Sequence, residues 1–194
     1  MQITNGEMKS SEPQITSALI SDAYRTEQER LHATGTYGTA SIAYAPMVSQ
    51  IVERMQVSHL LDYGCGSLTN LAKHLKVKSK LTYQAYDPAV PRFSKPPVPA
   101  QMVACIDVLE HIEPAYLTGV PDDIKRLTEG IAFITVHTGP AVKVLSDGRN
   151  AHLTQQPLEW WLPKLWERFD IQTVQAMDNG FYVIGVAKLI EMAS

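Results

Sequence analysis

The hydrophobic positions of the chain fall into short apolar runs separated by longer segments of mixed polarity. The runs with the length and composition of buried strands are residues 59–62, 81–87, 102–107 and 131–137. Between them, apolar residues recur at helical spacing over residues 45–55, 69–75 and 121–128. Strands that alternate with helices in this way predict an α/β domain with a mostly parallel sheet.

The last part of the chain has a different pattern. Residues 157–169 have the spacing of a helix, and two strand-like runs follow at residues 171–176 and 181–188. Residues 178–180 join these two runs with the sequence Asp-Asn-Gly, and Asn-Gly between strands is a strong signal for a tight hairpin. We therefore expect an antiparallel pair of strands at the C-terminal end of the sheet.

The segment before the first strand is predicted to be helical. Apolar residues recur at helical spacing over residues 13–31, and Ser21 can cap a helix that starts at Asp22. We divide the chain accordingly into an N-terminal helical extension or lid, residues 1–36, and a main domain, residues 37–194.

Two segments are predicted to be loops. Five prolines fall within residues 88–101, and proline fixes φ and removes a backbone donor, so neither a helix nor a central strand can form there. Residues 138–156 join the last parallel strand to the C-terminal helix, and loops of this length are usually functional or disordered.

Three of the predicted strands end in an acidic residue. Asp62, Asp87 and Asp107 each close an apolar run, and the carboxyl ends of parallel strands lie at the sheet edge where α/β proteins bind ligands. Gly64 and Gly66 follow the first strand, and glycine lets the backbone turn with φ > 0 and approach a bound molecule. The next helix would point its free N–H groups at the same place. We therefore predict a ligand site at this edge.

In these segments the chain resembles the class I S-adenosylmethionine-dependent methyltransferases. Residues 62–66 (Asp-Tyr-Gly-Cys-Gly) match the glycine-rich first motif of that family, and residues 86–87 (Tyr-Asp) match the acid after its second strand. Residues 106–111 (Ile-Asp-Val-Leu-Glu-His) match the segment at the end of its fourth strand. The resemblance covers about residues 37–189 and implies a Rossmann-like, doubly wound sheet whose third-strand unit is shortened or missing. Leu68 stands where many members have a further glycine.

The resemblance implies S-adenosylmethionine as cofactor, with S-adenosylhomocysteine as product. Gly64 and Gly66 would lie against its methionine portion, and Asp62 would fix the loop and reach its amino group. Asp87 would accept hydrogen bonds from both ribose hydroxyls, and Pro88 would give the adenine an apolar contact. The full set of predicted cofactor-binding residues is Tyr37, Asp62, Gly64, Cys65, Gly66, Asp87, Pro88, Ile106 and Asp107.

Ring side chains of the N-terminal part allow two interpretations. Under the resemblance they form a lid over the cofactor; alternatively, they pack against the domain as ordinary core residues. The residues concerned are Tyr24, His32, Tyr37 and Tyr44.

Three histidines near the predicted strand ends are candidates for a general base. We predict His111, His137 and His152 as catalytic residues, because an imidazole with a pKa of about 6.5 can take a proton from an O or N nucleophile. We assign no metal. The alternative is a divalent cation, because the acid and histidine spacing is similar to that of the metal-dependent 2′-O-methyltransferases that act on small-RNA 3′ ends. The residues of this alternative are Asp107, Glu110, His111 and His152.

Composition limits the compartment and the partners. The 194 residues carry a formal net charge of −3, so no overall basic field attracts nucleic acid. Cys65 and Cys105 fall in apolar segments and indicate a reducing compartment. With no signal-peptide pattern and no apolar stretch of membrane-spanning length, we expect a cytoplasmic protein without a membrane partner.

Because indoles bury large areas, we expect Trp160, Trp161 and Trp166 in the core.

The expected function is transfer of a methyl group to an oxygen or nitrogen of a small-molecule or sugar-like acceptor. The Asn/Asp-Pro-Pro-Tyr/Phe motif of enzymes that methylate base amino groups is absent, and so is a Pro-Cys nucleophile. Two alternatives stay open. One is a metal-dependent RNA 2′-O-methyltransferase, and the other is a methyltransferase-like protein that binds or consumes S-adenosylmethionine without methylating.

Overall fold

A six-stranded sheet forms the centre of the protein. The computed structural model describes residues 19–188. The strands are β1 His59–Tyr63, β2 Thr82–Tyr86, β3 Ala100–Ile106, β4 Thr128–His137, β5 Phe169–Met177 and β6 Gly180–Ala187. Their order in the sheet is β2-β1-β3-β4-β6-β5, with the first four strands parallel and β6 antiparallel to both β4 and β5. The predicted parallel sheet and antiparallel final pair are confirmed.

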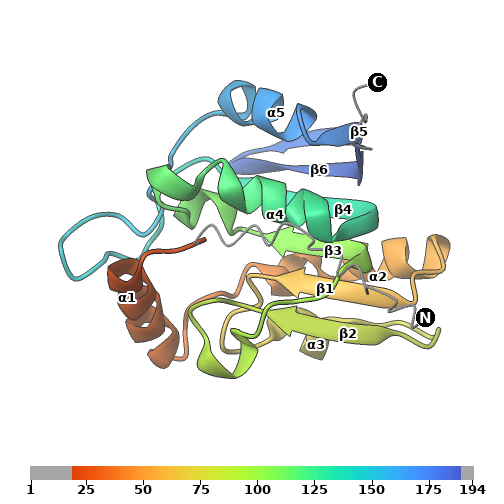
Figure 1. The fold of residues 1–194 in the computed structure, drawn as a ribbon, viewed down its shortest axis with the longest axis horizontal. Helices are drawn as coiled ribbons and strands as arrows, with labels where there is room; N and C mark the ends of the chain where they lie inside the picture. Colours follow the sequence, from red (N-terminus) through yellow and green to blue (C-terminus); the bar gives the residue numbers. More distant parts are fainter. Residues whose placement is uncertain (1–18, 189–194) are drawn as a thin grey trace, which may run out of the picture.

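Helices cover both faces of the sheet (Figure 1). The α-helices of the described residues are α1 Asp22–Ala33, α2 Ser41–Arg54, α3 Asn70–His74, α4 Gly119–Leu127 and α5 Leu158–Trp166. Short 3-10 helices add η1 Pro91–Phe93, η2 Leu109–His111 and η3 Pro114–Tyr116. Within residues 19–188, none of the helices combines the length and the apolar composition that a membrane crossing requires.

The two faces of the sheet bury alternate residues of each strand. Leu60 and Met102 pack with residues of α2 and α3, whereas their neighbours Leu61 and Val103 pack with residues of α4 and α5. All four side chains are fully buried. A parallel strand that is buried on both faces needs apolar residues at successive positions, and this is why the sequence shows continuous apolar runs.

The first described helix begins where the sequence indicated. Ser21 Oγ accepts a hydrogen bond from the backbone N–H of Tyr24 at 3.1 Å, which is the geometry of an N-cap. The same hydroxyl donates to Glu113 Oε1 at 2.7 Å, so the cap attaches α1 to the segment after β3. The part of the predicted helix before residue 19 lies outside the described residues. The domain division at residue 36 stays a prediction.

The proline-rich segment between β2 and β3 takes the place of a helix and a strand. Its regular structure is limited to η1, and the loop is closed by the N–H of Asp87, which donates to the carbonyl of Phe93 at 3.1 Å. As a result, β2 is one of the two edge strands of the described sheet. The prediction of a shortened third-strand unit is confirmed.

The predicted helix over residues 69–75 is confirmed to within one residue at each end. α3 has five residues and begins after Thr69, whose φ of 47° lies in the left-handed region. An L-residue in this conformation interrupts a right-handed helix, so Leu68 and Thr69 belong to the turn. The helix therefore begins directly after the glycine turn, with Thr69 as its N-cap.

The long loop between β4 and α5 packs against α1 (Figure 1, cyan and red). Leu145 and Ala151 of the loop share a buried cluster with Tyr24 and Leu31 of α1. Contacts with the N-terminal helix therefore hold in place a segment that the sequence predicts only as a loop.

The prediction for the tryptophans is partly wrong. Trp161 is buried in the core beneath α5, but Trp166 is 53% exposed. Trp160 is partly buried and packs edge-on against Trp161. A helix on the outside of a sheet buries a single stripe of its surface, so these three indoles cannot all face the sheet.

A phenylalanine of β4 gives a test of the core. We expect Phe133→Ala to lower the free energy of unfolding by about 3–5 kcal/mol, because removal of a fully buried ring leaves a cavity. Val174→Ala on β5, where the side chain is 38% exposed, should change that free energy by less than about 0.5 kcal/mol. Chemical denaturation measures both values, and equal effects would contradict the packing described above.

Candidate functional site

A cavity of about 540 Å³ opens at the ends of β1, β2 and β3. Its volume lies in the range of small-molecule sites. The strand-end acids Asp62, Asp87 and Asp107 all line it, as expected from the parallel order of the strands. The predicted cofactor-binding residues that the structure brings together here are Tyr37, Asp62, Gly64, Cys65, Gly66, Asp87, Pro88, Ile106 and Asp107.

The glycine turn is held by backbone hydrogen bonds to the neighbouring strand. The N–H groups of Gly64 and Cys65 donate to the carbonyl of Tyr86 at 2.8 and 3.1 Å. Gly64 has a φ of +80°, and a Cβ at this residue would lie 2.4 Å from Val108 Cγ2. A side chain there would displace the segment after β3, so the turn requires glycine at this position.

Asp87 fixes the other half of the turn. Its carboxylate accepts hydrogen bonds from the N–H of Gly66 at 3.0 Å and from the N–H of Ala89 at 2.9 Å. Burial raises the pKa of this carboxyl above its usual value, while His32 and the two N–H groups lower it. The prediction that Asp62 fixes the glycine loop is wrong, because the oxygen that the Gly66 N–H reaches belongs to Asp87.

Asp62 is a buried acid on β1. It is 3% exposed and accepts a hydrogen bond from the hydroxyl of Tyr83. Burial raises the pKa of Asp62 to about 7; the Tyr83 hydrogen bond opposes this rise and the charge of Asp87 adds to it. An acid that titrates near neutral pH can lose its proton when a cationic group binds beside it.

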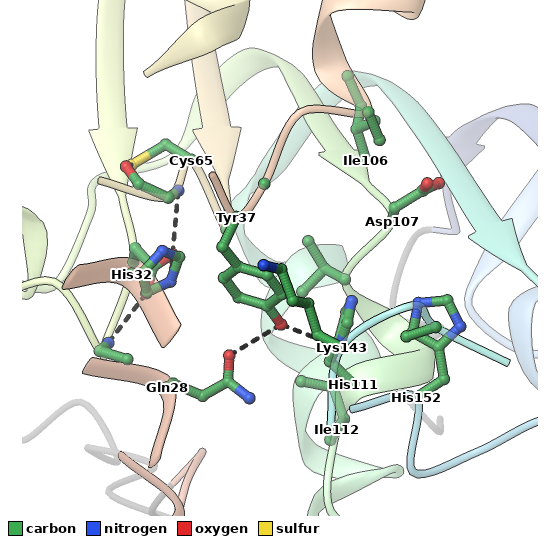
Figure 2. A pocket seen from close by; sticks show the side chains of 18 of the residues that line it. Gln28, His32, Tyr37, Cys65, Ile106, Asp107, His111, Ile112, Lys143 and His152 are labelled. Atoms are coloured by element: carbon green, nitrogen blue, oxygen red, sulfur yellow. Dashed lines mark hydrogen bonds and ion pairs between the residues drawn. The ribbon is translucent and has the colours of Figure 1, made fainter. Parts of the chain in front are cut away.

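Two N-terminal tyrosines contact His111. Tyr37 Oη lies 3.1 Å from His111 Nδ1 and 3.0 Å from Gln28 Oε1, to which it donates (Figure 2). Tyr24 Oη donates to the carbonyl of His111 at 2.7 Å. Tyr24 and Tyr37 line the cavity, so they form one of its walls in addition to packing against the domain. Tyr44 is not among the lining residues, and its ring packs edge-on against Phe133 of β4.

The predicted catalytic histidines lie side by side in the cavity wall. The ring centroids of His111 and His152 are 4.6 Å apart, and those of His137 and His152 are 4.9 Å apart. Nδ1 of His111 lies 2.8 Å from the carbonyl oxygen of Ala151, and Nδ1 of His152 lies 2.7 Å from that of Gly139. Because a carbonyl oxygen only accepts, these two Nδ1 atoms carry the proton and each Nε2 keeps a lone pair.

Two of these histidines are held in the neutral form. Burial lowers the pKa of His111 to about 3, and the neighbouring His152 contributes to the fall. Burial also lowers the pKa of His152, while its hydrogen bond to Gly139 acts in the opposite direction. Since a general base works best with a pKa near the operating pH, His152 is better suited than His111 to accept a proton.

Glu110 is fully buried beside the histidines. Its Oε1 accepts a hydrogen bond from the N–H of His137 at 2.8 Å, whereas its Oε2 has no partner among residues 19–188. Burial raises the pKa of Glu110 well above its usual value, and the charge of Asp107 adds to the rise. A buried carboxyl oxygen without a partner is unusual in a folded protein and calls for a ligand or a proton.

Three of the four residues in the metal alternative form a candidate cation site. One ligand atom from each of Glu110, His111 and His152 lies within 4.8 Å of the others. The structure does not bring Asp107 into this group; its carboxylate accepts a hydrogen bond from the hydroxyl of Thr135 instead.

Gln28 and Lys143 are among the polar residues of the cavity wall that sequence reasoning missed. Gln28 lies on the same face of α1 as Tyr24 and Leu31, and that helical spacing is the signal that could have placed it. Lys143, from the long loop, points into the cavity and donates from Nζ to Thr36 Oγ1 at 3.1 Å (Figure 2). The position of Lys143 depends on how the loop folds over α1, and no local pattern in the sequence shows this.

Comparison with known proteins identifies the fold through structure and not through sequence. No protein-family model matches the chain, and no curated protein matches it in sequence. An O-methyltransferase family protein from Burkholderia thailandensis is 16% identical, with a TM-score of 0.57 over 88% of this chain and 60% of that one. The 1,6-didemethyltoxoflavin-N1-methyltransferase of the same organism is 14% identical, with a TM-score of 0.60 over 93% of this chain and 99% of that one. The small RNA methyltransferase HEN1 is 11% identical, with a TM-score of 0.57 over 76% of this chain and 25% of that one.

These solved structures share the fold of the chain at low sequence identity. The chain has the class I methyltransferase fold. It spans 60% of the first of these proteins, which is less than two thirds of that protein's length, and nearly all of the second. The class I methyltransferase fold predicted from the strand-end motifs is therefore confirmed.

The pH dependence of stability tests the burial of Asp62 within this class I methyltransferase fold. Its pKa of about 7 in the folded protein exceeds the ordinary value of 3.8, so the folded state binds the proton more tightly than the unfolded state. Stability should therefore fall as pH rises from about 4 towards 7, by at most about 1.4 kcal/mol per pH unit. Asp62→Asn keeps an acceptor for Tyr83 and should remove this loss.

Denaturation of wild type and Asp62→Asn at about pH 5 and about pH 8 measures this effect. The variant should gain stability relative to the wild type as pH rises. A difference between the two proteins that stays constant with pH would show that the pKa of Asp62 is not raised.

Proposed function

We propose that the protein transfers the methyl group of S-adenosylmethionine to an oxygen or nitrogen of a small-molecule or sugar-like acceptor. The observation that carries this proposal is one cavity lined by the glycine turn, by Asp62 and Asp87, and by the three neighbouring histidines. The class I methyltransferase fold supports it. So does the N-methyltransferase with similar fold that was solved with S-adenosylhomocysteine and its small-molecule substrate, 1,6-didemethyltoxoflavin.

The residues of the cavity fit this cofactor. Each oxygen of Asp87 accepts one backbone N–H, and a carboxylate oxygen can accept a second hydrogen bond, so capacity remains for ribose hydroxyls. Asp62 is a buried acid that a cationic amino group would ionise. Gly64 and Gly66 lack side chains where the methionine portion would lie against the backbone.

When bound, S-adenosylmethionine supplies a reactive methyl sulfonium, so the protein has to orient the acceptor, exclude water and remove a proton. We assign proton removal to His152, whose Nε2 keeps its lone pair because Nδ1 donates to Gly139. His111, fixed between Ala151 and Tyr37, would orient the acceptor in its neutral form.

Calorimetric titration with S-adenosylmethionine and S-adenosylhomocysteine tests this proposal. We expect micromolar binding to the wild type, on the order of −8 kcal/mol. Asp87→Ala should weaken binding by about 1–3 kcal/mol, because the ribose hydroxyls lose their acceptor. Asp170→Ala removes a largely exposed carboxylate of β5, outside the cavity, and should leave the affinity unchanged.

Circular dichroism of the Asp87→Ala variant establishes that it is folded. Undiminished affinity in the folded variant would show that the nucleoside binds elsewhere. Transfer of a labelled methyl group into metabolite, RNA or protein fractions then identifies the class of acceptor. Tight binding without transfer to any fraction would favour the alternative of a protein that binds or consumes the cofactor without methylating.

A second candidate function is methyl transfer assisted by a divalent cation, with an RNA 2′-hydroxyl as acceptor. The observation that favours it is Glu110 Oε2, which is buried beside His111 and His152 and has no partner within the described part of the chain. Carboxylate and imidazole ligands suit such cations, and metal-binding histidines commonly donate their other ring N–H to a carbonyl, as both imidazoles do here. A cation at this place would bind two adjacent hydroxyls and acidify one of them. The solved structures of similar fold include the small RNA methyltransferase HEN1.

Cation binding to the purified protein can be measured directly by calorimetry with Mn²⁺ or Co²⁺. We expect Glu110→Gln and His152→Ala each to weaken this binding by about tenfold or more, because each removes a ligand. Glu129→Gln, an exposed acid of β4, is the matched control and should bind normally. Affinity should rise with pH, since Glu110 must release its proton to the solvent.

Two results would exclude the metal-assisted function. One is a protein that binds neither cation. The other is methyl transfer that proceeds at the same rate after treatment with a chelator as after addition of Mn²⁺.

A further inference from the structure

His32 lies over the carboxylate that the proposed function assigns to the ribose. Its Nε2 is 3.6 Å from Asp87 Oδ2, and both side chains are 10% exposed. The imidazole also packs against the glycine turn, since a Cβ on Gly66 would lie 3.3 Å from His32 Cε1. His32, in the last turn of α1, is thus part of the cavity wall beside Asp87, where the proposed function places the nucleoside.

Among residues 19–188, one ring nitrogen of His32 finds no hydrogen-bond partner. Nδ1 is buried and bonds to no residue in the described part of the chain. A buried polar atom without a partner costs about 1–3 kcal/mol, so such an atom in a cavity wall indicates a ligand that completes it. The packing of α1 does not explain why a histidine stands at this position, because Tyr24 and Leu31 make the apolar contacts of this helix.

The surroundings of His32 determine which nitrogen carries the proton. Burial lowers the pKa of His32, and the charge of Asp87 opposes this, so the ring is neutral at neutral pH and has a single N–H. With that N–H on Nε2, the ring faces the Asp87 carboxylate as a donor. Nδ1 is then an acceptor, and a ligand with a hydroxyl group could supply the donor that it lacks.

We propose that His32 is a second sugar-binding residue of the cofactor site. One hydroxyl of a vicinal diol donates to Asp87, and the other donates to Nδ1 of His32. The inference rests on the proposed function and adds to it a requirement for a ribose with both hydroxyls free. Loss of either hydroxyl leaves one buried acceptor without a donor, which is the arrangement that discriminates best between a ligand and its deoxy analogue.

Protein variants combined with ligand analogues test the inference. Calorimetry measures the binding of S-adenosylhomocysteine and of its 2′-deoxy and 3′-deoxy analogues to the wild type, to His32→Ala and to His32→Phe. The phenylalanine variant keeps a ring against Gly66 and Tyr37 but lacks both nitrogens, and it decides the matter if His32→Ala does not fold. His59→Ala, at the amino end of β1, is the matched control outside the cavity.

We expect both His32 variants to bind S-adenosylhomocysteine about tenfold more weakly than the wild type. One deoxy analogue lacks the hydroxyl that donates to His32. The wild type should bind this analogue about tenfold more weakly than S-adenosylhomocysteine, and the His32 substitutions should weaken its binding no further. The other analogue lacks the hydroxyl that faces Asp87. For this analogue, the binding free energy lost with the missing hydroxyl and that lost with the His32 substitution should add. His59→Ala should match the wild type with every ligand.

Three results would overturn the inference. Equal or tighter binding of S-adenosylhomocysteine by the His32 variants would do so and would leave the proposed function intact. If the His32 substitutions weaken the binding of all three ligands by the same factor, His32 only shapes the site. That result would also overturn the inference and leave the proposed function intact. A wild type that binds none of the three ligands would overturn the proposed function together with this inference.

Discussion

The rest of the cavity depends on the hydrogen bonds that the carboxylate of Asp87 accepts. This carboxylate accepts the N–H of Gly66 from the turn after β1 and the N–H of Ala89 from the loop after β2, and it faces His32 of α1. Three segments that are distant in sequence are therefore held at one point by one buried acid. The parallel pairing of β1 with β2 allows this, because it brings the turn and the acid to the same level of the sheet.

Burial of acidic side chains in the cavity wall lowers the stability of the folded protein. Burial raises the pKa values of Asp62, Asp87 and Glu110, so the folded protein disfavours their charged forms. Ligands that bring a positive charge or hydrogen-bond donors relieve this cost when they bind, which is why such groups concentrate at functional sites. The apolar clusters on the two faces of the sheet supply the stability that the site itself lacks.

The sheet could be predicted from the sequence because its parallel strands are buried on both faces and read as continuous apolar runs. The meeting of the three strand-end acids followed from that parallel order. The left-handed conformation of Thr69 could not be predicted, since it depends on the fold around that residue. Asp62 and Asp87 end neighbouring strands, so the sequence could not show that the Gly66 N–H reaches Asp87. Lys143 reaches the cavity only through the packing of a loop on a distant helix.

That helix, α1, contacts both the nucleoside part and the histidine part of the site. His32 in its last turn faces Asp87, while Tyr24 near its start donates to the carbonyl of His111. The loop that carries His152 packs on the same helix. One helix therefore positions the imidazole beside Asp87 and also contacts the segments that carry His111 and His152. Because a close-packed helix behaves as a rigid element, the packing of α1 fixes where these two parts of the cavity wall lie relative to each other.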